Sequence, residues 1–264
     1  MKIALFTSNQ VRHQSLINKL SEIAKELFVV CEGTTIFPGQ TQDFYNKSDV
    51  MQKYFSKMQQ AEEKVFGSIG FLNKNVRLLP IKMGDVNSLP LSWLKDLEDV
   101  DYAIVFGASW IKGELCDFLI KKKAVNIHMG ISPYYRGAAC NFWALYDKKP
   151  ELVGATLHYL SKGLDSGSMI LHALPKPQLV DGFEFGMLAV RSAQIALVFA
   201  LKEGSLFKFE AQSQNKSLQL RYSKRIEFND EVAFSYLTHP LSKEYIHEQC
   251  AQRNMELFLR PHVA

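Results

Sequence analysis

The sequence has few cysteines, and their spacing does not suggest a metal or redox site. Cys31, Cys116, Cys140 and Cys250 lie far apart and form no CxxC pair. A chain of 264 residues with 47% hydrophobic residues can build its core without disulfides, so we expect reduced thiols. His128 has no HxxxH or cysteine partner at ligand spacing, and we predict no metal site.

Strong charge and long apolar runs are also lacking. The formal net charge of +4 suits a small anionic substrate and does not require nucleic acid as a partner. The first residues, MKIALFTSNQ, contain too short an apolar run for a signal peptide and read as a strand. The longest apolar segment, MLAVRSAQIALVFAL, is interrupted by Arg191 and Gln194 and is too short to span a bilayer. We therefore expect a cytoplasmic protein without a membrane span.

Short apolar runs alternate with longer amphipathic ones over the first half of the chain. This alternation is typical of βαβ units and predicts a doubly wound, mostly parallel sheet. The strands are expected at residues 2–7, 28–33, 76–81, 101–107 and 124–129, and the helices at 15–27, 50–67, 92–98 and 111–120.

The pattern of predicted strands and helices changes in the second half of the chain. Residues 154–160 and 168–175 look like an antiparallel strand pair, and a long helix is expected at 183–203. Beyond it the pattern is mixed, with strand-like stretches LFKFEA and LQLRY and a helix near 243–258. The predicted fold class is α/β, a Rossmann-like, mostly parallel sheet with a short mixed C-terminal region. We assign residues 1–203 to a catalytic domain and residues 204–264 to a small C-terminal α+β extension.

A cluster of polar residues follows the predicted parallel strands. Asn126 and His128 lie two apart on a strand, so their side chains point to the same face. Ligands in open α/β sheets bind at the carboxyl ends of the strands, where this pair lies. Asp165 stands in KGLDSG, where Gly163 and Gly167 allow a tight turn that presents one carboxylate.

An amide, an imidazole and a carboxylate can together support acyl transfer to an amine. The first two can stabilise an oxyanion, and the carboxylate can orient the histidine and help to move a proton. The sequence has no GxSxG motif and no cysteine beside His128, which favours direct attack by the substrate amine over a covalent enzyme intermediate. The residues alone leave open the alternative that Asn126 and His128 are a hydrogen-bonded structural pair.

Three segments resemble known signatures of one family. NIHMGISPYYRGAACNFWAL resembles the signature of the 10-formyltetrahydrofolate-dependent formyltransferases, Asn-x-His-x-(Ser/Gly)-x-x-Pro-x-Tyr-Arg-Gly followed by Trp. GATLHYLSKGLDSG resembles their second signature, and DYAIVFGASWIKGEL resembles the loop that holds the pterin. The likeness is strong over residues 101–170 and looser over residues 1–200. Met129 and Ser132 depart from the family pattern, which has Pro and Leu at these positions.

The resemblance implies a formyltransferase fold and a folate-dependent N-formyltransferase. By position, Asn126, His128 and Asp165 match the catalytic residues of the family, and 10-formyltetrahydrofolate is the implied co-substrate. An amine would attack the formyl carbon, and N10 of the folate would leave. The resemblance also implies a set of residues that line the pterin pocket: Phe106, Gly107, Ala108, Ser109, Trp110, Ile111, Gly163 and Leu164.

Four subfamilies compete within the resemblance. Glycinamide ribonucleotide enzymes carry a Gly-rich loop after the first strand, whereas this chain has TSNQVRHQ. Formyltetrahydrofolate hydrolases carry an extra N-terminal domain, for which we expect no room. Methionyl-tRNA formyltransferases have a longer basic C-terminal domain, whereas the residues here after position 203 are nearly balanced in charge.

We therefore expect the acceptor to be a nucleotide-linked 4-amino-deoxy sugar of surface-polysaccharide or nonulosonate biosynthesis. The alternative is methionyl-tRNA, and a different class is a folate-binding domain without catalysis. A homodimer through the C-terminal residues is an arrangement that the sequence leaves open. Arg12, Asn87, Arg136 and Gly137 are the expected acceptor contacts. For Arg12 and its neighbour His13 the alternative is ordinary surface residues, and His158 is expected to be structural.

Overall fold

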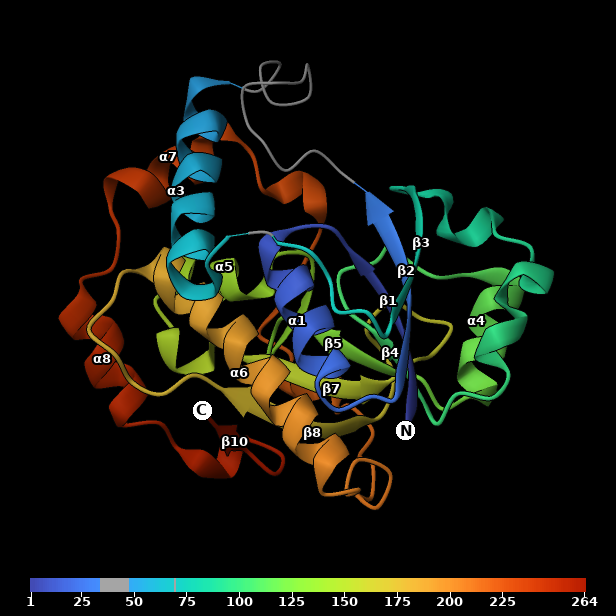
Figure 1. Cartoon of the computed structure of the whole chain (residues 1–264). Helices are drawn as coiled ribbons and strands as arrows, with labels where there is room; N and C mark the ends of the chain where they lie inside the picture. The colour runs from blue at the N-terminus through green and yellow to red at the C-terminus, as the bar shows by residue number, and fades with distance from the viewer. Residues whose placement is uncertain (34–47, 69) are drawn as a thin grey trace.

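The computed structural model describes residues 1–33, 48–68 and 70–264 and contains one large sheet (Figure 1). Its strand order is β10-β8-β7-β5-β4-β1-β2-β3, and β7 alone runs against the others. A second sheet pairs β6 with β9 in parallel. The strands are β1 (Lys2–Ser8), β2 (Glu26–Gly33), β3 (Val76–Lys82), β4 (Tyr102–Val105), β5 (Val125–His128), β6 (Tyr135–Gly137), β7 (Ala155–Tyr159), β8 (Met169–Leu174), β9 (Arg221–Ser223) and β10 (His262–Val263). The predicted α/β class with a mostly parallel sheet is confirmed.

The α-helices pack on the sheet and around the end of it that bears β7 and β8. They are α1 (Val11–Ser21), α3 (Asp49–Phe66), α4 (Gly113–Lys121), α5 (Cys140–Tyr146), α6 (Gly182–Lys202), α7 (Asp230–Thr238) and α8 (Lys243–Ala251). Short 3₁₀ turns connect them: η1 (Asp85–Ser88), η2 (Leu91–Leu97), η3 (Pro150–Leu152), η4 (Lys216–Leu218), η5 (Arg225–Glu227) and η6 (Met255–Leu257). Figure 1 shows α7 and α8 to the left of α5, on the side away from β1.

Both faces of the central strands are buried because helices cover both. In β1, Ile3 and Leu5 pack with α1 and α6, whereas Ala4 and Phe6 pack with η1, η2 and α4. This alternation with apolar residues on both sides is expected for a parallel strand between two helical layers. The strand order turns back at β1, since β2 lies on one side of it and β4 on the other. The loops after β1 and β4 therefore face a topological switch point, where ligands bind in such sheets.

Helix α6 is long and apolar enough to cross a membrane by length and composition alone. In the folded chain 67% of its apolar window is buried, which is the pattern of a core helix. Asp181 begins it by accepting a hydrogen bond from the Glu184 N–H, and Gly204 follows its end with a φ of 58°. The buried face of α6 packs on β7 and β8. Strand β5, which pairs with β7, carries Asn126 and His128 of the polar cluster.

Some predicted boundaries were wrong. The first helix, expected at 15–27, spans Val11–Ser21, and the residues after it enter β2 at Glu26. The C-terminal helix expected near 243–258 ends at Ala251. LFKFEA forms no strand, and of LQLRY only its last two residues lie in β9. The division at residue 203 stays a prediction. Residues after it return to the first part, since β10 joins the large sheet beside β8.

His172 on β8 gives the core a predictable response to acid. Burial lowers its pKa to about 4, and its Nδ1 accepts a hydrogen bond from the Leu259 N–H. The unfolded state therefore binds the proton more readily, and stability falls as the pH drops below about 6.5. We expect His172→Asn, whose amide oxygen can replace Nδ1, to reduce the loss of unfolding free energy between pH 7 and pH 5 by roughly 2 kcal/mol. Urea denaturation at both pH values measures this, and a loss equal to the wild type's would contradict it.

Candidate active site

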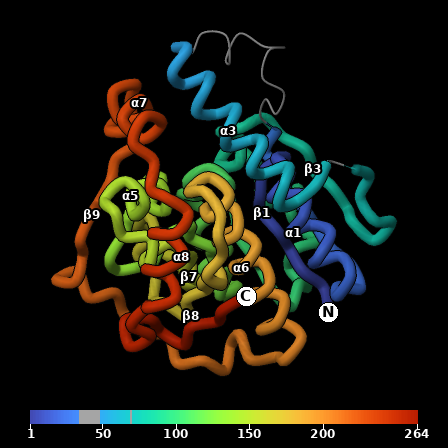
Figure 2. The backbone as a smooth tube through the Cα atoms, turned by 90° about the vertical axis from the view of Figure 1, so that its left-hand side faces the viewer, coloured from blue at the N-terminus to red at the C-terminus, as the bar shows by residue number. Residues whose placement is uncertain are grey.

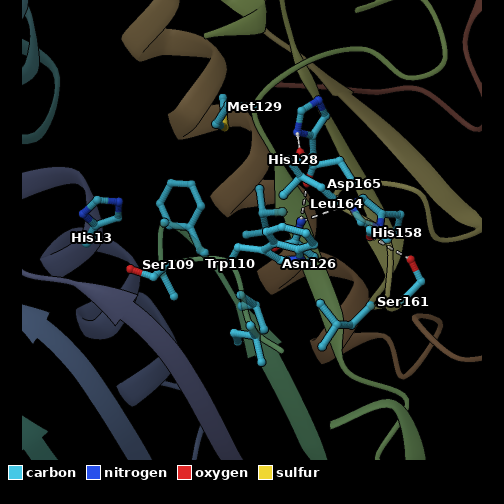
Figure 3. A pocket seen from close by; sticks show the side chains of 18 of the residues that line it. His13, Ser109, Trp110, Asn126, His128, Met129, His158, Ser161, Leu164 and Asp165 are labelled. Carbon is cyan, nitrogen blue, oxygen red and sulfur yellow. Dashed lines mark hydrogen bonds and ion pairs between the residues drawn. The ribbon is translucent and has the colours of Figure 1, made fainter. Parts of the chain in front are cut away.

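A cavity of about 300 Å³ opens at the switch point of the sheet (Figure 3). Its walls come from the start of α1, the loop after β4, the end of β5, and the segment from His158 to Asp165. Asn126 and His128 lie at one side of it, and Figure 3 shows His13 on the other side with Ser109 between them. The position agrees with the rule that sites form beyond the carboxyl ends of parallel strands.

Asp165 lies at the centre of the polar cluster. Its Oδ2 is 3.3 Å from His128 Nδ1, and its Oδ1 accepts a hydrogen bond of 3.2 Å from Asn126 Nδ2. The Nε2 of His158 lies 3.7 Å from the same Oδ1. Asp165 sits in a turn with a φ of 46°, left-handed for a residue other than glycine. The structure thus brings together the three residues that the sequence predicted to act together.

His158 contacts this cluster directly. Its Nδ1 lies 2.8 Å from the carbonyl of Tyr159, so Nδ1 carries the proton, and Nε2 can accept from Asn126 Nδ2 at 3.0 Å. The two N–H groups of Asn126 are therefore shared between His158 and Asp165. An oxyanion would have to compete with one of these acceptors for an Asn126 hydrogen.

The expectation that no cysteine lies beside His128 was wrong. The Sγ of Cys140 lies 3.5 Å from His128 Nε2, and the carbonyl of Tyr135 lies 3.4 Å from the same nitrogen. Cys140 is 12 residues away in sequence, and the turn between β5 and α5 brings it back to the ring. Cys140 does not line the cavity, and its thiol donates to the carbonyl of Gly137, so it contacts the imidazole from the protein side.

The charges of the cluster favour an imidazolium–carboxylate pair. Burial alone lowers the pKa of His128, but Asp165 and Cys140 outweigh it and raise that pKa well above its usual value. Burial likewise opposes ionisation of Asp165, but the neighbouring His128 and His158 hold its pKa below the usual range. With both ring nitrogens facing acceptors, the protonated form of His128 is satisfied on each side.

The loop after β4 forms another wall of the cavity. The eight residues that the resemblance assigned to the pterin pocket all line it: Phe106, Gly107, Ala108, Ser109, Trp110, Ile111, Gly163 and Leu164. Glu32, a fully buried acid at the end of β2, accepts hydrogen bonds from the backbone of Ser109 (2.5 Å) and Gly84 (2.8 Å). Glu32 was not predicted from the sequence, although an acid within the apolar run FVVCEG was the available signal.

Glu32 offers a test of this wall. Glu32→Ala leaves the Ser109 and Gly84 N–H groups without their charged acceptor, so the loop loses its fixed position. Hydrogen bonds to charged groups contribute about 1.5–3 kcal/mol, and we expect KM for the folate that the resemblance implies to rise by about tenfold or more. Glu26→Gln on the same strand, a partly exposed ion-pair residue, is the control. Steady-state kinetics measures both, and an unchanged KM in Glu32→Ala would refute the assignment.

Arg12 and His13 take different positions at the start of α1. The guanidinium of Arg12 pairs with the buried Glu62 at 2.9 Å and lines the cavity. His13 is buried against Phe106, and burial, helped by Arg12, lowers its pKa well below the usual value. The alternative of an ordinary surface residue is therefore wrong for His13. Contact of either residue with an acceptor stays a prediction.

The other three predicted acceptor contacts lie outside the cavity lining. Asn87 binds the loop after β4, donating to the Trp110 carbonyl and accepting from the Lys112 N–H. Arg136 is buried, with its guanidinium 3.4 Å from Gln219 Oε1. Gly137 lies on β6 against Ser223 of β9. Of the two departures from the family signature, Met129 lines the cavity, whereas Ser132 is buried beside Thr156.

Residues 96–176, the segment that contains the polar cluster, match the sequence model of the family described as formyl transferase. The resemblance found in the sequence is confirmed over that segment. Among curated proteins, the chain is similar to the methionyl-tRNA formyltransferase of Gloeothece citriformis, with 28% identity over 167 residues, 62% of this chain and 47% of that protein. The match thus spans less than half of the length of this relative.

Solved structures share the fold at low identity. The formyltransferase PseJ of Anoxybacillus kamchatkensis, solved with UDP-4,6-dideoxy-4-formamido-L-AltNAc and tetrahydrofolate, has a TM-score of 0.52 and 14% identity, covering 95% of this chain and 100% of that one. Phosphoribosylglycinamide formyltransferase of Anaplasma phagocytophilum has a TM-score of 0.54 and 16% identity, covering 83% and 98%. The fold is therefore that of formyltransferases, and at this level it does not separate acceptors.

Proposed function

We propose that this chain transfers a formyl group from 10-formyltetrahydrofolate to an amine. The observation that carries the proposal is the convergence of Asn126, His128 and Asp165 on one cavity at the switch point of the sheet. The wall formed by Phe106–Ile111 offers backbone groups and apolar side chains to a flat pterin. Trp110 and Leu164 remain partly exposed in that wall and would be covered by a bound folate.

The proposed reaction joins the acceptor nitrogen to the formyl carbon and breaks the bond from that carbon to N10. The tetrahedral intermediate carries an oxyanion, which an N–H of Asn126 and the positive charge of His128 stabilise. The attacking nitrogen loses a proton, and N10 gains one as it leaves. Asp165, ionised beside His128, is the one carboxylate among the described residues that line the cavity, and it takes up this proton and passes it through water to N10.

For the acceptor we favour a nucleotide-linked 4-amino sugar. Among the described residues that line the cavity, Arg12 is the only arginine or lysine, and Glu62 already neutralises it. A polyanion such as tRNA binds through clustered cations, whereas a sugar nucleotide needs few. PseJ, which was solved with a UDP-linked 4-formamido sugar, shares the fold over nearly the full length of both chains, so the proposed acceptor class is one that this fold can bind.

The competing acceptor is methionyl-tRNA, because the curated relatives that match by sequence are methionyl-tRNA formyltransferases. These matches cover 62%, 34% and 19% of this chain. The two proposals place different ligands beside His13 and Arg12, on the cavity wall opposite His158. One places a sugar nucleotide there, and the other places methionyl-tRNA.

A direct assay separates the acceptors. The protein is incubated with 10-formyltetrahydrofolate and either UDP- or dTDP-linked 4-amino sugars or methionyl-tRNA, and the products are weighed by mass spectrometry. We expect a sugar product heavier by one formyl group, and no product with His128→Ala. Formylation of methionyl-tRNA but of no sugar would overturn the acceptor proposal, and full activity of His128→Ala would overturn the mechanism.

A further inference from the structure

The turn that carries Asp165 is held by a residue far away in the sequence. Gln214 lies 49 positions later, outside the segment that matches the formyl transferase family. Its Nε2 donates to the carbonyl of Asp165 at 2.8 Å and to the carbonyl of Gly167 at 2.9 Å. One amide group therefore uses both of its hydrogens to bridge the two ends of the turn.

The backbone of this turn needs such support. Asp165 has a φ of 46°, a left-handed conformation that costs free energy and persists where surrounding contacts determine it. On the other side, a Cβ on Gly167 would lie 1.7 Å from the Tyr159 carbonyl, so the turn is pressed against β7. Ser161 completes the turn by bonding to Ser166 and to the Gly163 carbonyl.

Gln214 itself stands on a fixed part of the backbone. Two residues earlier, Gln212 and Met169 exchange both backbone hydrogen bonds, at 2.7 and 2.9 Å, at the start of β8. One residue later, Asn215 begins η4 by accepting from the Ser217 N–H. Figure 2 shows this orange segment after α6 running past β8 toward β9. The side chain thus reaches the turn from an anchored segment.

We propose that Gln214 is a positioning residue that holds the Asp165 carboxylate against His128 and Asn126. The contacts of that carboxylate are 3.3 Å and 3.2 Å long, near the upper limit of hydrogen bonding, so a shift of about half an ångström in the turn breaks them. The effect on the rate rests on the proposed function, whereas the effect on the His128–Asp165 pair does not.

Gln214→Leu tests the proposal because it keeps most of the volume and removes both donors. The groups that face His128 are Asp165 from the turn, Cys140 from α5 and His158 from β7. When the turn relaxes, Asp165 moves away, and we expect the pKa of His128, measured by NMR of the imidazole nuclei, to fall toward its usual value. We also expect kcat for formyl transfer to fall about tenfold, with KM for the folate unchanged.

Ser213→Ala, at the exposed neighbouring position, is the matched control and should leave both readouts at wild-type values. Gln214→Glu places an oxygen with negative charge against the two carbonyls and should lower kcat more than the leucine variant does. If Gln214→Leu fails to fold, Gln214→Glu tests the positioning role of Gln214. A wild-type pKa of His128 in either folded variant overturns the proposal, even if the protein proves to have no formyltransferase activity. A lowered pKa with no activity in the wild type overturns the proposed function instead.

Discussion

We expect Asp165→Asn to lower kcat/KM for the proposed formyl transfer by about three orders of magnitude. The amide keeps the shape of the side chain but removes the charge that faces His128 Nδ1 and presents an N–H where Asn126 needs an acceptor. Burial then acts on His128 with only Cys140 opposing it, so the pKa of His128 falls and a smaller fraction of the imidazole carries a positive charge. The variant thus loses the proton acceptor and the nearby positive charge together.

The same variant has a pH signature in its stability. The depressed pKa of Asp165 stabilises the fold above its ordinary value of 3.8, and this contribution disappears as the pH falls. The raised pKa of His128 stabilises the fold below its ordinary value of 6.5, and this contribution disappears as the pH rises. Asp165→Asn should therefore lose most thermal stability between about pH 4 and 6.5.

The control for this prediction is another Asp→Asn change. Asp96 is an exposed residue that pairs with Arg77 on the surface, and Asp96→Asn should leave rate and stability close to wild type. Kinetics with the acceptor identified by mass spectrometry and melting curves across the pH range provide the measurements. A rate for Asp165→Asn within a few-fold of wild type would refute its role.

Replacing Gly137 by Ala destabilises the fold by about 3 kcal/mol or more. The residue has a φ of 89°, which strains any side chain, and a Cβ would lie 2.1 Å from the Ser223 carbonyl. The obstacle is backbone, so β6 and β9 must separate to make room. The expected acceptor contact at Gly137 thus has a packing explanation that needs no ligand.

Gly186→Ala is the matched control. Gly186 lies within α6, and an added Cβ there meets nothing within 4 Å. Alanine in a helix interior is more favourable than glycine, so this variant should gain about 0.5–1 kcal/mol. Urea denaturation monitored by circular dichroism compares the two. Equal stability of Gly137→Ala and wild type would mean that β6 and β9 do not pair as described.

The periodicity of apolar residues predicted most strands of the sheet. It failed where the apolar spacing of a helix continues into a strand. The predicted helix at 15–27 ran too far because Ala24 and Leu27 continue the apolar spacing of Leu20, although Leu27 already belongs to β2. Its start was placed late because Gln10 makes no side-chain cap, so the sequence carries no start signal there. The ends of helices and strands that are set by strand pairing in the folded chain are poorly predicted from the local sequence pattern.

The site was predictable where it is local in sequence. Two side chains on one strand must share a face, so Asn126 and His128 could be paired from their spacing alone. Cys140, Glu32 and Gln214 reach the site only through turns and strand order, and only Glu32, an acid within an apolar run, has a signal in its neighbours. Residues that position other residues are therefore the part of the site that needs the structure.

The pairing of β6 with β9 joins residues about 86 positions apart, since Arg136 stands opposite Tyr222. Contacts of such sequence separation form late in folding, because the loop between them must close first. During synthesis, residues 1–203 emerge from the ribosome before the segment from Gln212 to Ser223 does. The emerged chain already contains every strand of the large sheet except β10, but the turns on either side of His128 acquire their final support only when these later residues emerge.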